Sequence, residues 1–144
     1  MTTRFRNSIR AEALLLALAC ALLLGCRADT TGLGTLSVEE VNARLAAGTD
    51  VVLCDANSAD TRTKLGVVAG AQLLSSYGDY DVASELPADK ARTLVFYCHS
   101  AFCSAAADAA RRAVAAGHED VFVMPDGIKG WVEARLPVVR PHAS

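Results

Sequence analysis

Residues 93–104, TLVFYCHSAFCS, join an apolar run to a polar loop that contains two cysteines. A continuous apolar run rich in β-branched and aromatic side chains is typical of a strand that is buried on both faces of a sheet. The next segment, Ser104 to Ala116, is rich in alanine and is followed by Gly117, a pattern that indicates a helix with a defined end. Cys98 is therefore predicted to lie where a buried strand gives way to a helix.

Two other short apolar runs, Val51 to Cys54 and Val121 to Met124, have the same character, and Asp55 closes the first of them. Ser37-Val38-Glu39-Glu40 fits a capping box, and the helix that it begins is predicted to stop at Gly48. Strands that alternate with helices predict a parallel sheet with helices on both sides. Ligands bind such sheets where strands end and helices begin, so the cysteine loop is a candidate site.

The N-terminal residues have the organisation of an export signal. Three arginines at positions 4, 6 and 10 precede an uncharged apolar run from Ala13 to Gly25, which is shorter than the roughly 20 residues that span a bilayer. The run ends in Leu23-Leu24-Gly25-Cys26, which resembles the lipobox of bacterial lipoproteins. The resemblance implies cleavage before Cys26 and acylation of its thiol. Cys20 fits this pattern less well, because the apolar run continues beyond it.

The predicted organisation is therefore a lipoprotein signal peptide over residues 1–25, a flexible tether over 26–35 and a single folded domain over 36–140. Acyl chains on Cys26 would anchor the exported domain to a lipid bilayer, facing the periplasm. Arg27 stands where an Asp commonly signals retention at the inner membrane, which favours the outer membrane. The whole chain has a formal charge of −2, and removal of a leader with three arginines and one acid makes it more acidic, which argues against nucleic acid as a partner.

The position of Cys98 favours a reactive thiol. A helix start presents unpaired N–H groups and the positive end of the helix dipole, and both stabilise an anion. A free cysteine has a pKa of about 8.5, and helix N-termini can lower it to about 3.5–7.5. We therefore expect Cys98 to be an exposed, ionised nucleophile, and the alternative is a buried structural cysteine.

Four segments, in the same order along the chain, resemble the rhodanese-like domains, and the resemblance covers nearly all of residues 37–137. They are VVLCD at 51–55 for the first core strand with its acidic end, GVVAGA at 66–71 for the Gly-His-Ile-Pro-Gly-Ala signature, YCHSAFCS at 97–104 for the active-site loop and DGIKGW at 126–131 for the Gly-Gly-x-x-x-Trp element, with Leu136-Pro137 as the closing pair. The resemblance implies a three-layer α/β/α fold around a central, mainly parallel sheet of about five strands.

The resemblance also implies sulfur transfer by covalent catalysis, without a cofactor. Cys98 would accept a sulfane sulfur from a small sulfur-containing donor, carry it as a persulfide and pass it to an acceptor, such as the thiol of a protein. The chain is thus predicted to be a sulfurtransferase or persulfide carrier. The loop residues predicted to bind the substrate are His99, Ser100, Ala101, Phe102 and Ser104.

The loop departs from the family pattern at two positions, because Ala101 replaces the usual Gly and Cys103 replaces the usual Arg. The loop therefore lacks the cation for an anionic donor, which His99 could partly supply when protonated, with Lys129 as a weaker candidate. Cys103 suggests a second hypothesis, in which it forms a redox dithiol with Cys98 or resolves the Cys98 persulfide. A third hypothesis is a domain that has lost catalysis and only binds a partner.

Other chemistry has less support in the sequence. Cys98, His99 and Cys103, together with Cys54 on a neighbouring strand, are a weak candidate for zinc or copper, so no metal is predicted. A phosphatase of the related fold would need an Arg where Ser104 stands, in order to grip phosphate with two hydrogen bonds.

Two residues outside the loop, Asp55 and Trp131, also have predicted roles. Asp55 is expected either to support the loop or, as is more common at a strand end, to cap a turn. Trp131 is expected to pack in the core, with a backbone partner for its indole N–H. The sequence indicates no catalytic or metal-binding pattern that includes His118 or His142.

Overall fold

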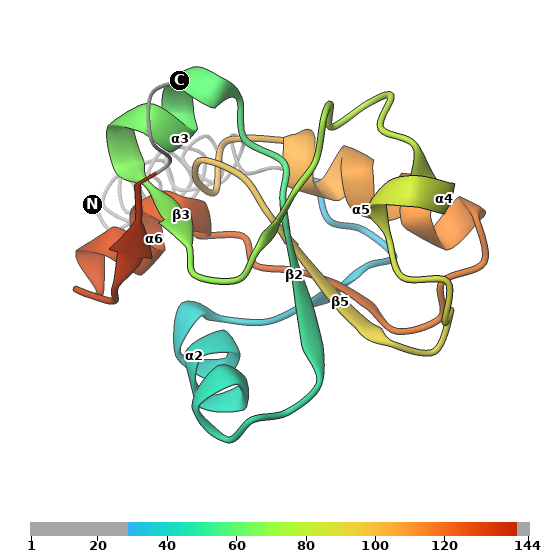
Figure 1. Cartoon of the computed structure of the whole chain (residues 1–144), viewed down its shortest axis with the longest axis horizontal. Coiled ribbons are helices and arrows are strands. Elements are labelled where there is room, and N and C mark those ends of the chain that lie inside the picture. Colours follow the sequence, from blue (N-terminus) through green and yellow to red (C-terminus); the bar gives the residue numbers. More distant parts are fainter. Residues whose placement is uncertain (1–28, 141–144) are drawn as a thin grey trace, which may run out of the picture.

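The computed structural model describes residues 29–140 (Figure 1). The predicted signal peptide, Cys20, Cys26 and His142 lie outside the described residues, so what the sequence indicates for them stays a prediction. Within residues 29–140, no helix has the length and apolar character needed to cross a membrane.

A five-stranded parallel sheet forms the centre of the domain, as predicted. β5 (Thr93–Tyr97) lies in the middle and pairs with β2 (Val51–Asp55) on one side and with β6 (Val121–Val123) on the other. β1 (Gly34–Thr35) extends the sheet beyond β6, and β4 (Gln72–Leu73) extends it beyond β2. The carboxyl ends of β2 and β5 are therefore neighbours.

Helices cover both faces of this sheet (Figure 1). α5 (Ala105–Ala115) and the short α4 (Val82–Glu85) lie on one face. The other face is covered by three helices, α2 (Val38–Ala46), α3 (Ala59–Leu65) and α6 (Gly127–Glu133). This arrangement confirms the predicted three-layer α/β/α architecture.

Side chains of β5 alternate between the two faces, because successive residues of a strand point in opposite directions. Leu94 and Phe96 pack in the buried cluster beneath α5, whereas Val95 and Tyr97 pack in the cluster beneath α2 and α6. The alternation continues beyond the end of the strand, since Cys98 belongs to the cluster beneath α5. The cysteine therefore points toward the face on which α5 begins.

The N-terminal end of the domain differs from the prediction. Residues 34–35 belong to the predicted flexible tether, but in the structure they form β1 and pair with Phe122 and Val123. Gly34 is needed there because a Cβ at this position would lie 2.5 Å from the Phe122 ring. In the sequence Gly34 indicates flexibility, but in the structure it allows two strands to approach each other closely.

The capping box at the start of α2 is confirmed. Ser37 Oγ accepts a hydrogen bond from the Glu40 N–H at 3.2 Å, and Glu40 Oε2 accepts one from the Ser37 N–H at 2.7 Å. The helix ends at the predicted place, because Ala47 caps it and Gly48 follows with a φ of 68°.

A second, two-stranded antiparallel sheet joins β3 (Val67–Val68) to β7 (Val138–Val139) and packs on the α6 side. Trp131 is buried beside it and donates its indole N–H to the Pro137 carbonyl at 2.9 Å. The predicted packing role of Trp131 is therefore confirmed.

Candidate active site

The cysteine loop lies between β5 and α5 and is held from two directions. Within the loop, the Cys103 N–H donates to the Ser100 carbonyl at 3.0 Å, which forms a tight turn. From outside, α6 donates two backbone N–H groups, from Ile128 to the Cys98 carbonyl at 2.8 Å and from Lys129 to the His99 carbonyl at 3.0 Å. The loop is thus closed by its own turn and attached to α6.

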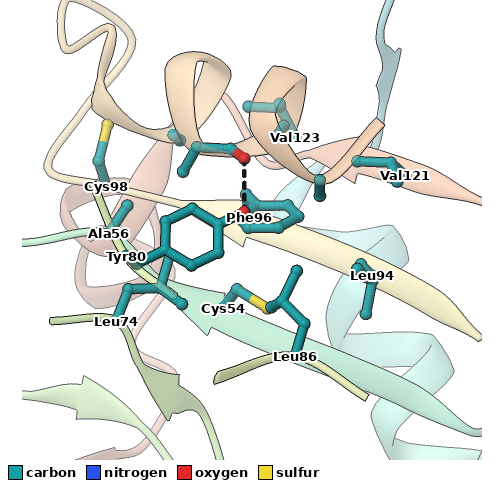
Figure 2. Packing of buried hydrophobic residues seen from close by; sticks show 14 residues of the cluster. Cys54, Ala56, Leu74, Tyr80, Leu86, Leu94, Phe96, Cys98, Val121 and Val123 are labelled. Carbon is teal, nitrogen blue, oxygen red and sulfur yellow. Dashed lines mark hydrogen bonds between the residues drawn. The ribbon is translucent and has the colours of Figure 1, made fainter. Parts of the chain in front are cut away.

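Cys98 is buried, which corrects the expectation of an exposed and ionised thiol. Its side chain is 2% exposed, and Figure 2 shows its sulfur atom where the loop enters α5, at the edge of the buried cluster. The thiol donates a hydrogen bond to the Cys103 carbonyl at 3.1 Å. A hydrogen bond with the Cys103 side chain and then burial raise the pKa of Cys98, although N–H groups of Ala106 and His99 oppose this.

Cys103, in contrast, is partly exposed, and it is the cysteine of the pair whose pKa is lowered. The hydrogen bond from the Cys98 thiol lowers the pKa of Cys103 to about 5 against the opposing effect of burial. The N–H groups of His99 and Ala105 and the charge of His99 act in the same direction. Loop N–H groups thus lower the pKa of both cysteines, but the net shift is downward only for Cys103.

A pocket of about 370 Å³ opens beside Cys103 and His99. Its other walls come from the segments that follow β2 and β4 and from the start of α5, and they consist of Ala56, Asn57, Ser58, Thr61, Ser75, Ser76, Tyr77 and Ala105. Most of these side chains are hydroxyl or amide groups. Among the described residues that line the pocket, none is Lys, Arg, Asp or Glu.

The other predicted loop residues lie on different sides of the loop. His99 lines the pocket beside Cys103, and its Nδ1 lies 3.2 Å from Ser100 Oγ. Ser100, Ala101 and Phe102 instead line a separate hollow against α2 and α6. Phe102 is 73% exposed at the tip of the loop. The structure therefore brings His99, but not these three residues, to the pocket that Cys103 faces.

Two further predicted residues lie away from this pocket. Ser104 stands before the first residue of α5 without a side-chain capping hydrogen bond. Lys129 lines the separate hollow, where its Nζ lies 3.8 Å from Glu133 Oε1. Lys129 is therefore placed to pair with its own helix and not to bind a donor at Cys103.

Asp55 caps a turn and anchors the end of β2. Its Oδ1 accepts hydrogen bonds from the Asn57 N–H at 2.7 Å and the Arg62 Nε at 3.2 Å, and its Oδ2 accepts one from the Tyr97 hydroxyl at 2.7 Å. Tyr97 in turn accepts a hydrogen bond from the Val68 N–H at 3.2 Å. Asp55 is fully buried, so it supports the strand next to the loop through Tyr97 and does not reach substrate.

Cys54 and His118 are both buried, and their surroundings indicate structural roles. Cys54 is fully buried on β2, and burial raises its pKa to about 12. His118 is buried, and its Nε2 lies 3.0 Å from Lys90 Nζ. No group of three or more His, Cys, Asp and Glu side chains in residues 29–140 is arranged to hold a metal ion.

Sequence reasoning missed the pocket walls. Asn57, Ser76 and Tyr77 come from polar turns without a motif, and only the fold brings these turns beside the cysteine loop. Asn57 is 7% exposed, and its Nδ2 has no hydrogen-bond partner in the described structure. The burial of Cys98, however, had a signal in the sequence, because alternation along β5 places it on the same face as Leu94 and Phe96.

The family of the chain follows from its match to the rhodanese-like domain over residues 37–134, which include the cysteine loop and the Trp131 element. This chain belongs to the rhodanese-like domain family. The match covers more than half of the sequence and agrees with the fold. No curated protein matches the rhodanese-like chain.

Solved structures share the rhodanese-like fold at low identity. Thiosulfate sulfurtransferase from Pseudomonas aeruginosa is 22% identical with a TM-score of 0.64, and the match covers 77% of this chain and 21% of that enzyme. A Rhodopseudomonas palustris protein of unknown function, named a possible tyrosine phosphatase, is 22% identical with a TM-score of 0.62 and coverage of 75% and 86%. A rhodanese-related protein from Thermoplasma volcanium is 16% identical with a TM-score of 0.59 and coverage of 75% and 99%.

Proposed function

We propose that this rhodanese-like domain is a sulfurtransferase or persulfide carrier that works through the cysteines of its loop. The observation that carries the proposal is the pairing of Cys98 with Cys103, two free cysteines in one loop, in which the Cys98 thiol donates a hydrogen bond to the Cys103 carbonyl at 3.1 Å. Such a loop stabilises a thiolate nucleophile and the anionic sulfur of a persulfide. Phosphate ester hydrolysis is not proposed, because residues 98–104 contain no Arg.

The proposal is tested by giving the full-length chain, purified in mild detergent, a persulfide donor. We expect the chain to gain one sulfur atom, measured by intact mass, or to release one sulfide for each donor consumed. Heat-unfolded protein controls for reaction with unstructured thiols. A chain that neither gains sulfur nor releases sulfide would contradict the proposal.

A second candidate function, a dithiol oxidoreductase, is favoured by the contact of the Cys98 thiol with Cys103, because two neighbouring cysteines can form a disulfide. The same chain would then be treated with an ordinary disulfide that carries no sulfane sulfur. Loss of two hydrogens, with a Cys98–Cys103 disulfide, supports this candidate when no sulfur is gained from the persulfide donor. Inertness to both reagents would leave a module that only binds a partner.

We propose further that the domain works in the periplasm, attached to the membrane through lipid on Cys26. The support is the arginine-rich start, the short apolar run and the Leu23-Leu24-Gly25-Cys26 segment. Labelled fatty acid should be incorporated into the expressed chain, and Cys26→Ser should abolish this incorporation, whereas Cys20→Ser should preserve it. Incorporation that survives Cys26→Ser would contradict the anchor.

A further inference from the structure

We propose that Cys103 attacks the sulfur donor and that Cys98 then resolves the product, with the hydropersulfide of an uncharged thiol as the donor. This inference rests on the proposed sulfur transfer and deepens it. It reverses the roles that the family resemblance implies, in which Cys98 receives the sulfur.

Access to solvent separates the two cysteines. Cys103 lines the pocket of about 370 Å³ together with His99, so a small donor in this pocket can reach its sulfur. Cys98 is 2% exposed and is not among the residues that line the pocket. A donor would therefore meet Cys103 before it could meet Cys98.

The hydrogen bonds assign the proton to Cys98. Its thiol donates to the Cys103 carbonyl at 3.1 Å and contacts the Cys103 side chain, so the proton stays between the two residues. N–H groups of His99 and Ala105 face the Cys103 sulfur and favour its thiolate. The thiolate, and not the thiol, is the nucleophile in sulfur exchange, so Cys103 is prepared to attack while Cys98 waits protonated.

The pocket walls indicate the class of donor. Its lining residues expose more apolar than polar surface, which suits a small uncharged molecule, and no Lys or Arg among the described lining residues could bind a dianion with charge-assisted hydrogen bonds. Asn57 also lines this wall and carries no charge. Among the described lining residues, only His99 could compensate the charge of a thiosulfate-like dianion, and its single charge would leave that dianion poorly compensated.

The proposed steps balance in atoms and electrons. The Cys103 thiolate attacks the outer sulfur of R–S–S–H, a bond forms from Cys103 Sγ to this sulfur, and the donor leaves as R–S⁻, which takes the proton of Cys98. The Cys98 thiolate then attacks Cys103 Sγ, which forms the Cys98–Cys103 disulfide and releases HS⁻. The two protein thiols lose two electrons, and the sulfane sulfur is reduced to sulfide. A thiol reductant from outside the chain restores the pair.

The roles are tested with two variants of the full-length chain, Cys98→Ser and Cys103→Ser, and with 2-hydroxyethyl hydropersulfide as the donor. Cys98→Ser should gain one sulfur and keep it, because the resolving thiol is absent. Cys103→Ser should gain sulfur in its loop at least about tenfold more slowly, since Cys98, the thiol that remains in the loop, is buried and protonated. Cys54→Ala, which removes a fully buried thiol elsewhere, should behave as the unchanged chain does.

The outcomes separate this inference from the proposed function. Faster loading of Cys103→Ser than of Cys98→Ser would overturn the order of attack but leave sulfur transfer standing. Absence of both sulfur gain and sulfide release in the unchanged chain would overturn the two proposals together. Thiosulfate offered at the same concentration should load Cys98→Ser more slowly than the hydropersulfide, and equal loading would overturn the donor class.

A measurement on the unchanged chain does not depend on how the variants fold. Brief treatment with iodoacetamide at neutral pH, followed by unfolding and cleavage with chymotrypsin after Tyr97 and Phe102, places Cys98 and Cys103 on separate peptides. Cys103 should be alkylated at least about tenfold faster than Cys98, and Cys54 supplies the rate of a buried thiol. Equal rates, or faster alkylation of Cys98, would overturn the assignment.

Discussion

The carboxyl ends of β2 and β5 lie side by side but serve opposite purposes. At the end of β2, both oxygens of Asp55 are engaged, by Asn57, Arg62 and Tyr97. At the end of β5, the Cys98 thiol donates a hydrogen bond to the Cys103 carbonyl, and Cys103 lines an open pocket. The comparison shows how one strand end can be fixed so that its neighbour can carry reactive groups. Tyr97 connects the two, because it belongs to β5 and binds the carboxylate on β2.

The largest expected effect is the loss of stability when the interactions of Asp55 at the end of β2 are removed. Asp55→Ala should lower the free energy of unfolding by about 3 to 5 kcal/mol, because it leaves the largely buried Arg62 without its carboxylate. Urea unfolding monitored by circular dichroism measures this change. Asp60→Asn is the matched control, since its pair with Lys64 is exposed and should contribute at most about 0.5 kcal/mol. Similar losses in the two variants would show that Asp55 does not anchor β2.

The lowered pKa of Cys103 should appear in the pH dependence of its alkylation rate. With a pKa of about 5, Cys103 stays charged above that pH and gains a proton only as the pH falls through it. Its rate should therefore change little between pH 6 and pH 8, whereas an ordinary thiol with a pKa of about 8.5 loses about tenfold for each pH unit. Peptide mass spectrometry after timed alkylation checks this. A tenfold fall for each unit across this range would contradict the assignment of charge.

A substitution in α6 should disturb the reactive end from outside the loop. Gly127 has a φ of 61°, and a Cβ there would lie 2.4 Å from the Cys98 carbonyl oxygen. Gly127→Ala should therefore lower stability by about 2 to 3 kcal/mol and slow the alkylation of Cys103. Gly78→Ala is the control, because a Cβ at Gly78 meets no atom within 4 Å. Unchanged alkylation in a destabilised Gly127→Ala would show that the loop does not depend on this contact.

The smallest expected effect concerns the residue that joins the two strand ends. Tyr97→Phe removes a hydroxyl that donates to Asp55 and accepts from Val68, and should lower the free energy of unfolding by about 1 to 2 kcal/mol. Thermal and urea unfolding would measure it. Tyr77→Phe, at a residue that is 51% exposed, should change stability by less than about 0.5 kcal/mol. Equal losses of stability in Tyr97→Phe and Tyr77→Phe would mean that the hydrogen bonds of the Tyr97 hydroxyl contribute nothing to the free energy of unfolding.

The elements that the sequence predicts well are those decided by local pattern. β5 was predicted at its observed bounds because its apolar run is continuous, and the Ser37 capping box defines the start of α2 through residues three positions apart. α3 was not predicted because its sequence, ADTRTKL, has no apolar stripe and its helix buries no residue. Its position depends instead on Arg62, which binds carbonyls of Asp55 and Leu74.

The candidate site was predicted only in part, for a similar reason. The sequence places both cysteines in the loop, but the difference between their surroundings depends on the direction of each side chain and on turns far away in the chain. The partnership of Asp55 with Tyr97 spans 42 positions and follows from the register of β2 against β5. No local pattern contains that register.

The hydrogen bond from the Ile128 N–H to the Cys98 carbonyl fixes the direction of a whole peptide unit. The carbonyl of Cys98 and the N–H of His99 belong to one planar trans peptide, so they point in opposite directions. Because α6 binds the carbonyl oxygen of Cys98, the N–H of His99 points the other way, toward the two cysteines. This N–H lowers the pKa of both Cys98 and Cys103. In this way α6, which lies on one face of the sheet, orients an N–H group that stabilises a sulfur anion on the opposite face.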